Sequence, residues 1–167
     1  MKKLSTFAAA MAGIAALGFG GSAVLAADAT GSASVTIATP IAISQTTALD
    51  FGTVTASASA GTAVISTAGA RSVTGGVGAL GGSPAAAVFA VTGQGNNAFS
   101  ITLPSSATLN GPSAATMTVD TFAHNAGASP ALSSGSKTVN VGATLNVGAN
   151  QTVGAYTGNY TVTVNYN

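Results

Sequence analysis

The sequence ends with Gly154-Ala155-Tyr156-Thr157-Gly158-Asn159-Tyr160-Thr161-Val162-Thr163-Val164-Asn165-Tyr166-Asn167. Apolar and polar residues alternate without interruption over its last part, and the apolar positions are Tyr160, Val162, Val164 and Tyr166. Successive side chains of a strand point to opposite sides, so this pattern predicts a strand with one apolar and one polar face. We expect the rest of the chain to supply the strands and the core against which this face packs.

Shorter alternating runs recur along the chain between segments rich in Gly, Ser, Asn and Pro. They predict strands near residues 35–43, 48–54, 63–66, 86–92, 99–103, 117–122 and 139–147. Outside the first 26 residues, no stretch combines a period of 3.6 with helix caps. The sequence therefore predicts an all-β fold: an immunoglobulin-like antiparallel β-sandwich of Greek-key type with about seven to nine strands. An up-and-down barrel is the alternative, but the uneven strand and loop lengths favour the sandwich.

Several residues mark irregular points in these strands. Pro40 removes a backbone donor, which predicts an edge strand or a crossing between sheets. Gly52 indicates a bulge or turn, and Phe122, in the opposite phase to the residues before it, indicates a bulge. The turn at residues 93–97 predicts that the strands on either side of it form a hairpin.

The N-terminus has the pattern of an export signal. Lys2 and Lys3 precede an alanine-rich apolar run at residues 7–17, and Val24-Leu25-Ala26 has the small residues of a cleavage site. A transmembrane anchor is the alternative, but the apolar run is short and glycine follows it. We therefore expect residues 1–26 to be removed, leaving one domain at residues 27–167 with a mobile arm at 27–34, exported to the periplasm, the cell surface or the medium, with no stable membrane span.

The chain beyond residue 26 carries almost no charge. Two cations against three carboxylates leave a net charge of −1, compared with +1 for the whole chain. Nucleic-acid binding needs a clustered basic surface, so no nucleic-acid partner is expected. A nearly uncharged surface does little to keep copies of itself apart, which favours life inside an assembly. With no cysteine, stability must come from strand pairing and burial.

Two short motifs resemble enzyme signatures but lack their context. Residues 76–81 match G-x-G-x-x-G, yet no helix is predicted after them and no acidic residue lies about 20 residues on. Residues 134–137 match S-x-x-K, yet they lie in a Gly/Ser loop rather than on a helix. We expect neither to bind a cofactor or to catalyse a reaction.

The remaining polar residues do not predict a catalytic or metal site either. The single histidine, His124, is too far along the strand from Asp120 for a direct hydrogen bond. One histidine, no cysteine and three scattered aspartates do not make a zinc or calcium site. No catalytic residue, cofactor or metal is expected, and the protein is predicted not to be an enzyme.

The end of the chain resembles the C-terminal signature of chaperone–usher pilins. Counted back from Asn167, Gly154 is the fourteenth residue and Tyr166 is the penultimate one, with alternating apolar residues between them. In that family the last strand pairs with an edge strand of a periplasmic chaperone and later lies beside a strand donated by the next subunit. The physical basis is β-augmentation, in which main-chain hydrogen bonds give affinity and alternate side chains fill pockets.

A wider resemblance covers nearly the whole of residues 27–167. It rests on Leu49-Asp50-Phe51-Gly52-Thr53-Val54, Gly75-Gly76-Val77, Val91-Thr92-Gly93, Phe99-Ser100-Ile101-Thr102-Leu103-Pro104, and the runs Leu145–Gln151 and Gly158–Tyr166. These segments resemble the exported bacterial domain-of-unknown-function family 4402, which is similar to spore-coat-U and fimbrial subunit domains. The resemblance implies an immunoglobulin-like sandwich with a surface or fibre role and no assigned activity.

These observations lead to a non-enzymatic, exported structural subunit that assembles through strand exchange with itself, helped by a periplasmic chaperone. The donated or first strand would carry Val35, Ile37, Ile41 and Ile43, and the strand beside the acceptor groove would carry Gly154, Tyr160, Val162, Val164 and Tyr166. About 22 residues lie between the cleavage site and Leu49, which leaves open whether residues 27–43 donate a strand or complete their own sandwich. The alternative is a monomeric adhesin or glycan-binding module that uses loops such as residues 93–97.

Overall fold

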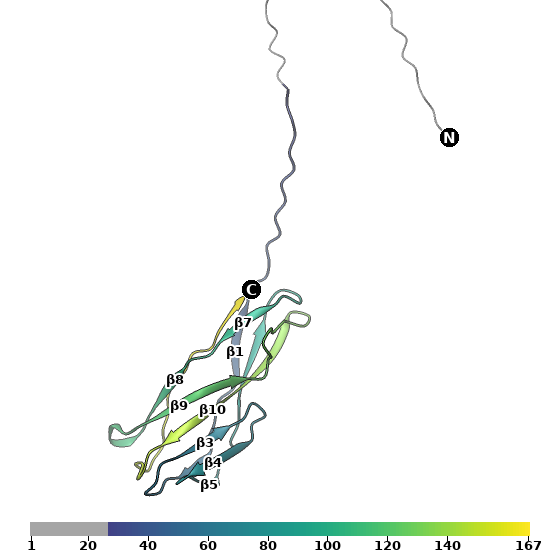
Figure 1. The fold of residues 1–167 in the computed structure, drawn as a ribbon. Helices are drawn as coiled ribbons and strands as arrows, with labels where there is room; N and C mark the ends of the chain where they lie inside the picture. The colour runs from purple at the N-terminus through teal and green to yellow at the C-terminus, as the bar shows by residue number, and fades with distance from the viewer. Residues whose placement is uncertain (1–26) are drawn as a thin grey trace, which may run out of the picture. The chain divides into compact units, whose positions relative to one another are not determined.

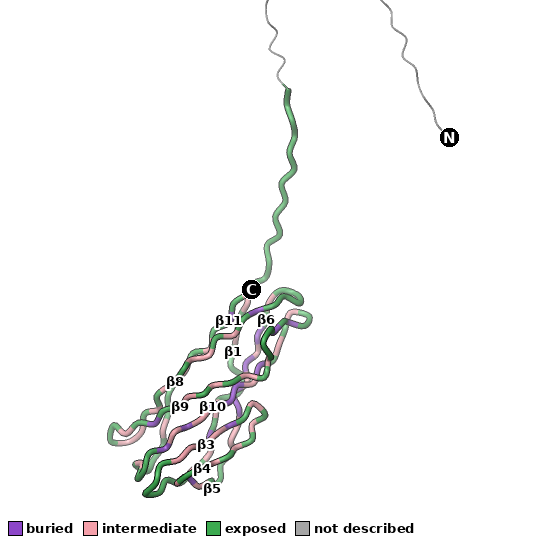
Figure 2. The backbone as a smooth tube through the Cα atoms, in the orientation of Figure 1, coloured by how far each residue is buried: buried purple, intermediate pink, exposed green. Residues whose placement is uncertain are grey.

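The computed structural model describes residues 27–167, so the predicted export signal at residues 1–26 lies outside the described residues. The chain divides into an N-terminal unit ending at Thr36 and a compact unit, Ile37–Asn167. Residues 27–41 contain no regular secondary structure, and residues 27–40 are exposed throughout (Figure 2). No helix in the described part is long and apolar enough to cross a membrane.

The compact unit consists of antiparallel strands and one short 3-10 helix, Pro112–Ala114 (Figure 1). Its strands are β1 Ala42–Thr47, β2 Thr53–Thr55, β3 Gly61–Ile65, β4 Arg71–Gly75, β5 Gly78–Gly81, β6 Ala87–Thr92, β7 Phe99–Thr102, β8 Ser106–Asn110, β9 Thr116–His124, β10 Ser136–Val147 and β11 Thr163–Tyr166. The all-β antiparallel fold is confirmed. Eleven strands in the described residues exceed the expected seven to nine, because β5 and β8 form from stretches with few large apolar residues.

The long strand β10 organises the larger, seven-stranded sheet. Its first half, up to Val141, pairs with β6, its second half, from Ala143, pairs with β3, and β9 also pairs with it. The change of neighbour falls at Gly142, where a Cβ atom would collide with the carbonyl oxygen of Ile65. Glycine is therefore needed here, because the end of β3 leaves no room for a side chain.

Two small ribbons, β7–β11 and β2–β5, complete the fold. Phe99 of β7 and Val164 of β11 belong to one buried cluster with side chains of β6 and β10. Phe51, just before β2, belongs to a second cluster with side chains of β3, β9 and β10. The ribbons thus pack their apolar faces on the seven-stranded sheet, an arrangement consistent with the predicted sandwich.

The predicted hairpin around residues 93–97 is wrong. β6 is paired on both edges, by β1 and by β10, so no edge is free for the next strand. β7 pairs with β11 instead, which buries Phe99 completely (0% exposed). Residues 93–97 therefore carry the chain from one sheet to the other.

The predicted irregularities at Gly52 and Phe122 are confirmed. Gly52 has a positive φ of 67°, and the β2–β5 pairing changes register immediately after it. In β9, the pairing with β10 shifts between Ala123 and Asp120, and Thr121 has a φ of 51°. This bulge turns the ring of Phe122 toward the core, where it packs against both buried clusters.

Candidate functional site

The inward face of the last segment is the one that the sequence predicts. Tyr160, Val162 and Tyr166 are half-buried and Val164 is buried, whereas the residues between them are exposed. All four contact the cluster that contains Phe99. A regular strand begins only at Thr163, because pairing with β7 covers Thr163–Tyr166 alone.

Tyr166 ties this end of the segment to the start of the domain. Its Oη atom donates a hydrogen bond to the carbonyl oxygen of Thr39 (2.9 Å) and accepts one from the backbone N–H of Gln94 (2.5 Å). Next to this contact, Ile41 and Ile43 pack on the same core cluster, and Ile43 pairs with Val91 of β6. Ile43 thus belongs to the protein's own first strand, and Ile41, just before it, packs on the same core.

A groove opens beside the other half of the segment. Residues 154–160 form one wall and residues 49–54 form the other, enclosing about 480 Å³. Met117, Val119 and Leu145, all buried members of the core, line it between these walls. The groove therefore leads from solvent to the apolar interior between two segments that are not hydrogen-bonded to each other in the described residues.

The backbone of residues 154–160 is paired on one edge only. Thr157 exchanges both of its backbone hydrogen bonds with Asn110, at the end of β8 (2.8 and 3.0 Å). Because backbone groups of extended chain point alternately to the two edges, the peptide groups of Tyr156 and Gly158 face the opposite side. No backbone partner for Gly158 or Tyr160 is found within residues 27–167, so an unpaired edge runs along the groove.

Arg71 holds the opposite wall in place. One guanidinium nitrogen donates to the carbonyl oxygens of Phe51 (2.9 Å), Thr53 (3.1 Å) and Gly81 (2.9 Å). Asp50 adds a side-chain bond to the backbone N–H of Gly52 (2.6 Å). A cation among these carbonyl oxygens fixes the wall without strand pairing across the groove.

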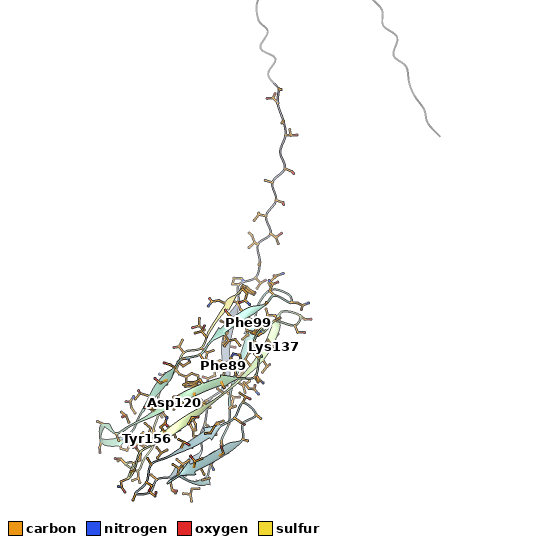
Figure 3. All side chains as sticks on the ribbon, viewed as in Figure 1. Phe89, Phe99, Asp120, Lys137 and Tyr156 are labelled. Atoms are coloured by element: carbon orange, nitrogen blue, oxygen red, sulfur yellow. The ribbon has the colours of Figure 1, made fainter. Side chains whose placement is uncertain are left out.

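The open end of the groove is shaped by Gly154 and Tyr156. Gly154 has a φ of 143°, and a side chain there would collide with the ring of Pro112, so glycine fits for both reasons. The hydroxyl of Tyr156 donates to the carbonyl oxygen of Thr152 (2.7 Å) and accepts from the side-chain amide of Gln151 (2.8 Å). These bonds fix the Tyr156 ring, labelled in Figure 3, in the groove wall.

Tyr160 lies where the groove meets the core. Its ring packs against Phe122 (centroids 5.0 Å apart) and edge-on against Phe89 (6.4 Å). Its hydroxyl oxygen is buried and has no hydrogen-bond partner in the described residues. Burial raises the pKa of Tyr160 to about 12, because desolvation disfavours the phenolate.

Val35 and Ile37 differ from the other predicted assembly residues. They are 87% and 91% exposed, as large apolar side chains seldom are. The structure therefore divides the predicted set: Ile41 and Ile43 pack on the core cluster, whereas Val35 and Ile37 are exposed. Residues 27–37 alternate small or apolar residues at odd positions with mostly polar ones at even positions.

The enzyme-like motifs lie in other settings. Residues 78–81 form strand β5 rather than a loop before a helix, and Ser134 occupies a tight turn (φ 50°) into β10. The imidazole Nδ1 of His124 accepts from the backbone N–H of Ala126, whereas Asp120 accepts from Asn146 (2.8 Å). Within residues 27–167, no group of three or more histidines and acids gathers as a metal site would require.

Two polar side chains of residues 93–97, the loop considered for glycan binding, bind within the chain itself. Gln94 accepts a hydrogen bond from the backbone N–H of Thr39 (3.2 Å), and Asn96 accepts one from that of Ser134 (2.8 Å). These amides hold neighbouring segments of the protein.

Comparison with known protein families gives one match, over residues 41–166, to the domain of unknown function DUF4402. The chain belongs to the DUF4402 family. No curated protein and no solved structure matches it. The matched region begins at Ile41, one residue before β1, so the DUF4402 domain coincides with the compact β fold and the exposed residues 27–40 precede it.

Sequence reasoning identified one side of the groove and missed the other. The alternation from Tyr160 onward predicted the inward face, but no local pattern indicated that residues 49–54 lie opposite. Arg71 was also missed as a positioning residue. The available signal was that Arg71 is one of only two cations after residue 26.

Proposed function

We propose that this protein is an exported, non-enzymatic structural subunit that polymerises by strand exchange. In this proposal the exposed segment at residues 29–37 of one copy fills the groove between residues 49–54 and 154–160 of the next. The single observation that carries it is the coexistence, in one chain, of an open groove with an unpaired backbone edge and an exposed alternating segment of matching chemistry. Fimbrial subunits and surface-coat proteins are the corresponding classes.

The exposed segment is long enough to span the groove. An extended chain rises about 3.3 Å per residue, so the nine residues 29–37 span about 30 Å and the seven residues 154–160 about 23 Å. The odd-numbered side chains would face the core and the even-numbered ones, mostly Ser and Thr, would face solvent. The unpaired peptide groups beside Thr157 would gain partners, as in other cases of β-augmentation.

The geometry of the attachment favours exchange between copies. The exposed segment meets the domain at Thr39, which is hydrogen-bonded to Tyr166 at the end of the C-terminal segment 154–166. The groove lies beside the beginning of that C-terminal segment, at residues 154–160. A head-to-tail contact between different surfaces generates a filament when its rotation does not close into a ring. An open groove also leaves apolar surface exposed before assembly, so we extend the proposal to a periplasmic chaperone whose edge strand occupies it first.

The test compares residues 27–167 with the same chain lacking residues 27–38, by size-exclusion chromatography with light scattering. We expect polymers of graded size from the longer chain, and none from the truncated chain. Adding a synthetic peptide of residues 27–39 should restore binding to the truncated chain, whereas a peptide with Asn at positions 35 and 37 should not. A longer chain that remains monomeric at every concentration would overturn the proposal.

The monomeric adhesin remains the second reading of the fold. Because the amides of Gln94 and Asn96 already bind within the chain, no observation in the described residues favours a glycan site there.

A further inference from the structure

Three residues that lie far apart in the sequence are joined by hydrogen bonds just before β1. The hydroxyl of Tyr166 donates to the carbonyl oxygen of Thr39 (2.9 Å) and accepts from the backbone N–H of Gln94 (2.5 Å). The side-chain oxygen of Gln94 in turn accepts from the backbone N–H of Thr39 (3.2 Å). Both backbone groups of Thr39 are therefore bound, one by the last strand and one by the loop after β6. We call Thr39, Gln94 and Tyr166 the Thr39 clamp.

The residues next to the Thr39 clamp are suited to it. A Cβ atom at position 93 would collide with the Tyr166 hydroxyl, so Gly93 leaves the space that this hydroxyl occupies. Pro40 has a fixed φ and favours an extended backbone at the residue before it, which is Thr39. The backbone at residues 39–40 is thus restricted, whereas residues 27–38 contain no regular secondary structure and are exposed.

The side chain of Gln94 contributes little to the folded domain. It is exposed, and water competes for both partners of its bond to Thr39, so the net gain in stability is small. The bond does fix the point at which the exposed segment begins. In the proposed strand exchange Ile37 enters the groove of another copy, so Ala38 is the one residue between the inserted part and the bound Thr39.

We infer that Gln94 and Tyr166 are positioning residues for strand exchange, because they hold the base of the donated segment. A donor that is already held at its base loses less conformational freedom on insertion than a donor whose base is free. With one free residue between the Thr39 clamp and the groove, the clamp also limits how two neighbouring domains can be oriented. Neither Gln94 nor Tyr166 lines the groove, so both act through Thr39. This inference rests on the proposed function.

The first test replaces Gln94 by Met, which keeps the length of the side chain but removes the acceptor for Thr39. In residues 27–167, the concentration at which polymers dissociate should rise about three- to tenfold, which is part of the entropy cost of fixing one residue's backbone. Gln94→Glu keeps an oxygen acceptor and should assemble as the wild type does. Asn96→Ala, the matched control, removes an amide bond to Ser134 from the same loop and should leave assembly unchanged.

The second test separates positioning from any effect on the groove. A free peptide of residues 27–39 is attached to no domain, so the Thr39 clamp cannot position it. It should therefore bind the chain lacking residues 27–38 equally well with and without Gln94→Met, as measured by fluorescence anisotropy of the labelled peptide. Weaker binding to the Gln94→Met chain would overturn the inference, because Gln94 would then shape the groove itself.

The outcomes distinguish this inference from the proposed function. If the wild type assembles and Gln94→Met matches it, the Thr39 clamp does not position the segment and strand exchange stands. The same conclusion follows if Asn96→Ala weakens assembly as much as Gln94→Met does, since any loosening of the loop would then suffice. If the wild type never assembles, the proposed function itself fails.

Discussion

Replacing Val35 and Ile37 by Asn should abolish assembly without affecting the folded domain. Their side chains are 87% and 91% exposed, so the isolated molecule gains almost nothing from burying them. In the groove each would become buried, and full burial of a Val or Ile side chain contributes about 1.5–3 kcal/mol. The pair therefore contributes about 3–6 kcal/mol to each contact between subunits, or about 10²- to 10⁴-fold in its dissociation constant.

Two measurements on the same samples separate assembly from stability. Sedimentation velocity over a range of concentrations gives the size distribution, and urea unfolding followed by tyrosine fluorescence gives the stability of the domain. The double variant should sediment as a monomer where the wild type forms polymers, with an urea midpoint equal to that of a wild-type sample diluted to monomer. The matched control is Ser34→Asn with Thr36→Asn, which changes the outward face of the same segment and should still assemble.

Two outcomes would refute this reasoning. If the Val35/Ile37 variant assembles as the wild type does, the exposed segment is not what fills the groove. If the variant instead loses domain stability by more than about 1 kcal/mol, these side chains pack within their own molecule, contrary to their exposure.

Three further predictions concern the frame around the groove. Tyr166→Phe removes the hydrogen bonds to two backbone groups and should lower the free energy of unfolding by about 1–3 kcal/mol in a urea titration, whereas an unchanged value would mean that this contact is not formed in solution. Arg71→Met should cost about 2–3 kcal/mol by the same assay, because three carbonyl oxygens lose a charged donor, while Lys137→Met should cost under about 0.5 kcal/mol. Burial raises the pKa of Tyr160 to about 12 from 10.0, so the folded protein favours the neutral phenol and its free energy of unfolding falls as the pH rises from about 10 to 12. The urea midpoints at pH 9 and pH 11 should therefore differ less in Tyr160→Phe than in the wild type.

The parts of the fold that the sequence predicts are those set by local alternation. β10 alternates over most of Ser136–Val147, and β6 and β9 are found where apolar residues are in phase. Even the bulge before Phe122 follows from a local change of phase. Period-2 patterning depends only on each strand having one buried face, so it can be seen without knowing the partner.

Pairing partners depend on distant residues, and here the prediction fails. The turn at residues 93–97 looks the same in sequence whether it joins paired strands or carries the chain between sheets. The difference lies in β1 and β10, which occupy both edges of β6. Strand β8 escapes notice because only Leu109 gives it a large apolar side chain.

The candidate site shows the same division. The inward positions of the last segment could be predicted from its own alternation, but the groove depends on residues 49–54 lying opposite, a contact between segments about 100 residues apart. Within residues 27–43, which the sequence treated as one set, Ile41 and Ile43 pack on the core whereas Val35 and Ile37 are exposed. Pro40, which precedes β1, marks the boundary.

The most direct test of strand exchange is disulfide trapping between two different copies, which is clean because the natural chain has no cysteine. A chain with Ser34→Cys is mixed with chains lacking residues 27–38 that carry a single cysteine at Ala155, Thr157 or Asn159, all exposed beside the groove. We predict efficient cross-linking at one of these three positions, which also gives the register, and none to a cysteine at Ser72 on β4. Equal cross-linking to Ser72 and to the groove positions, or none anywhere, would contradict the claim that one copy's segment occupies the groove of another.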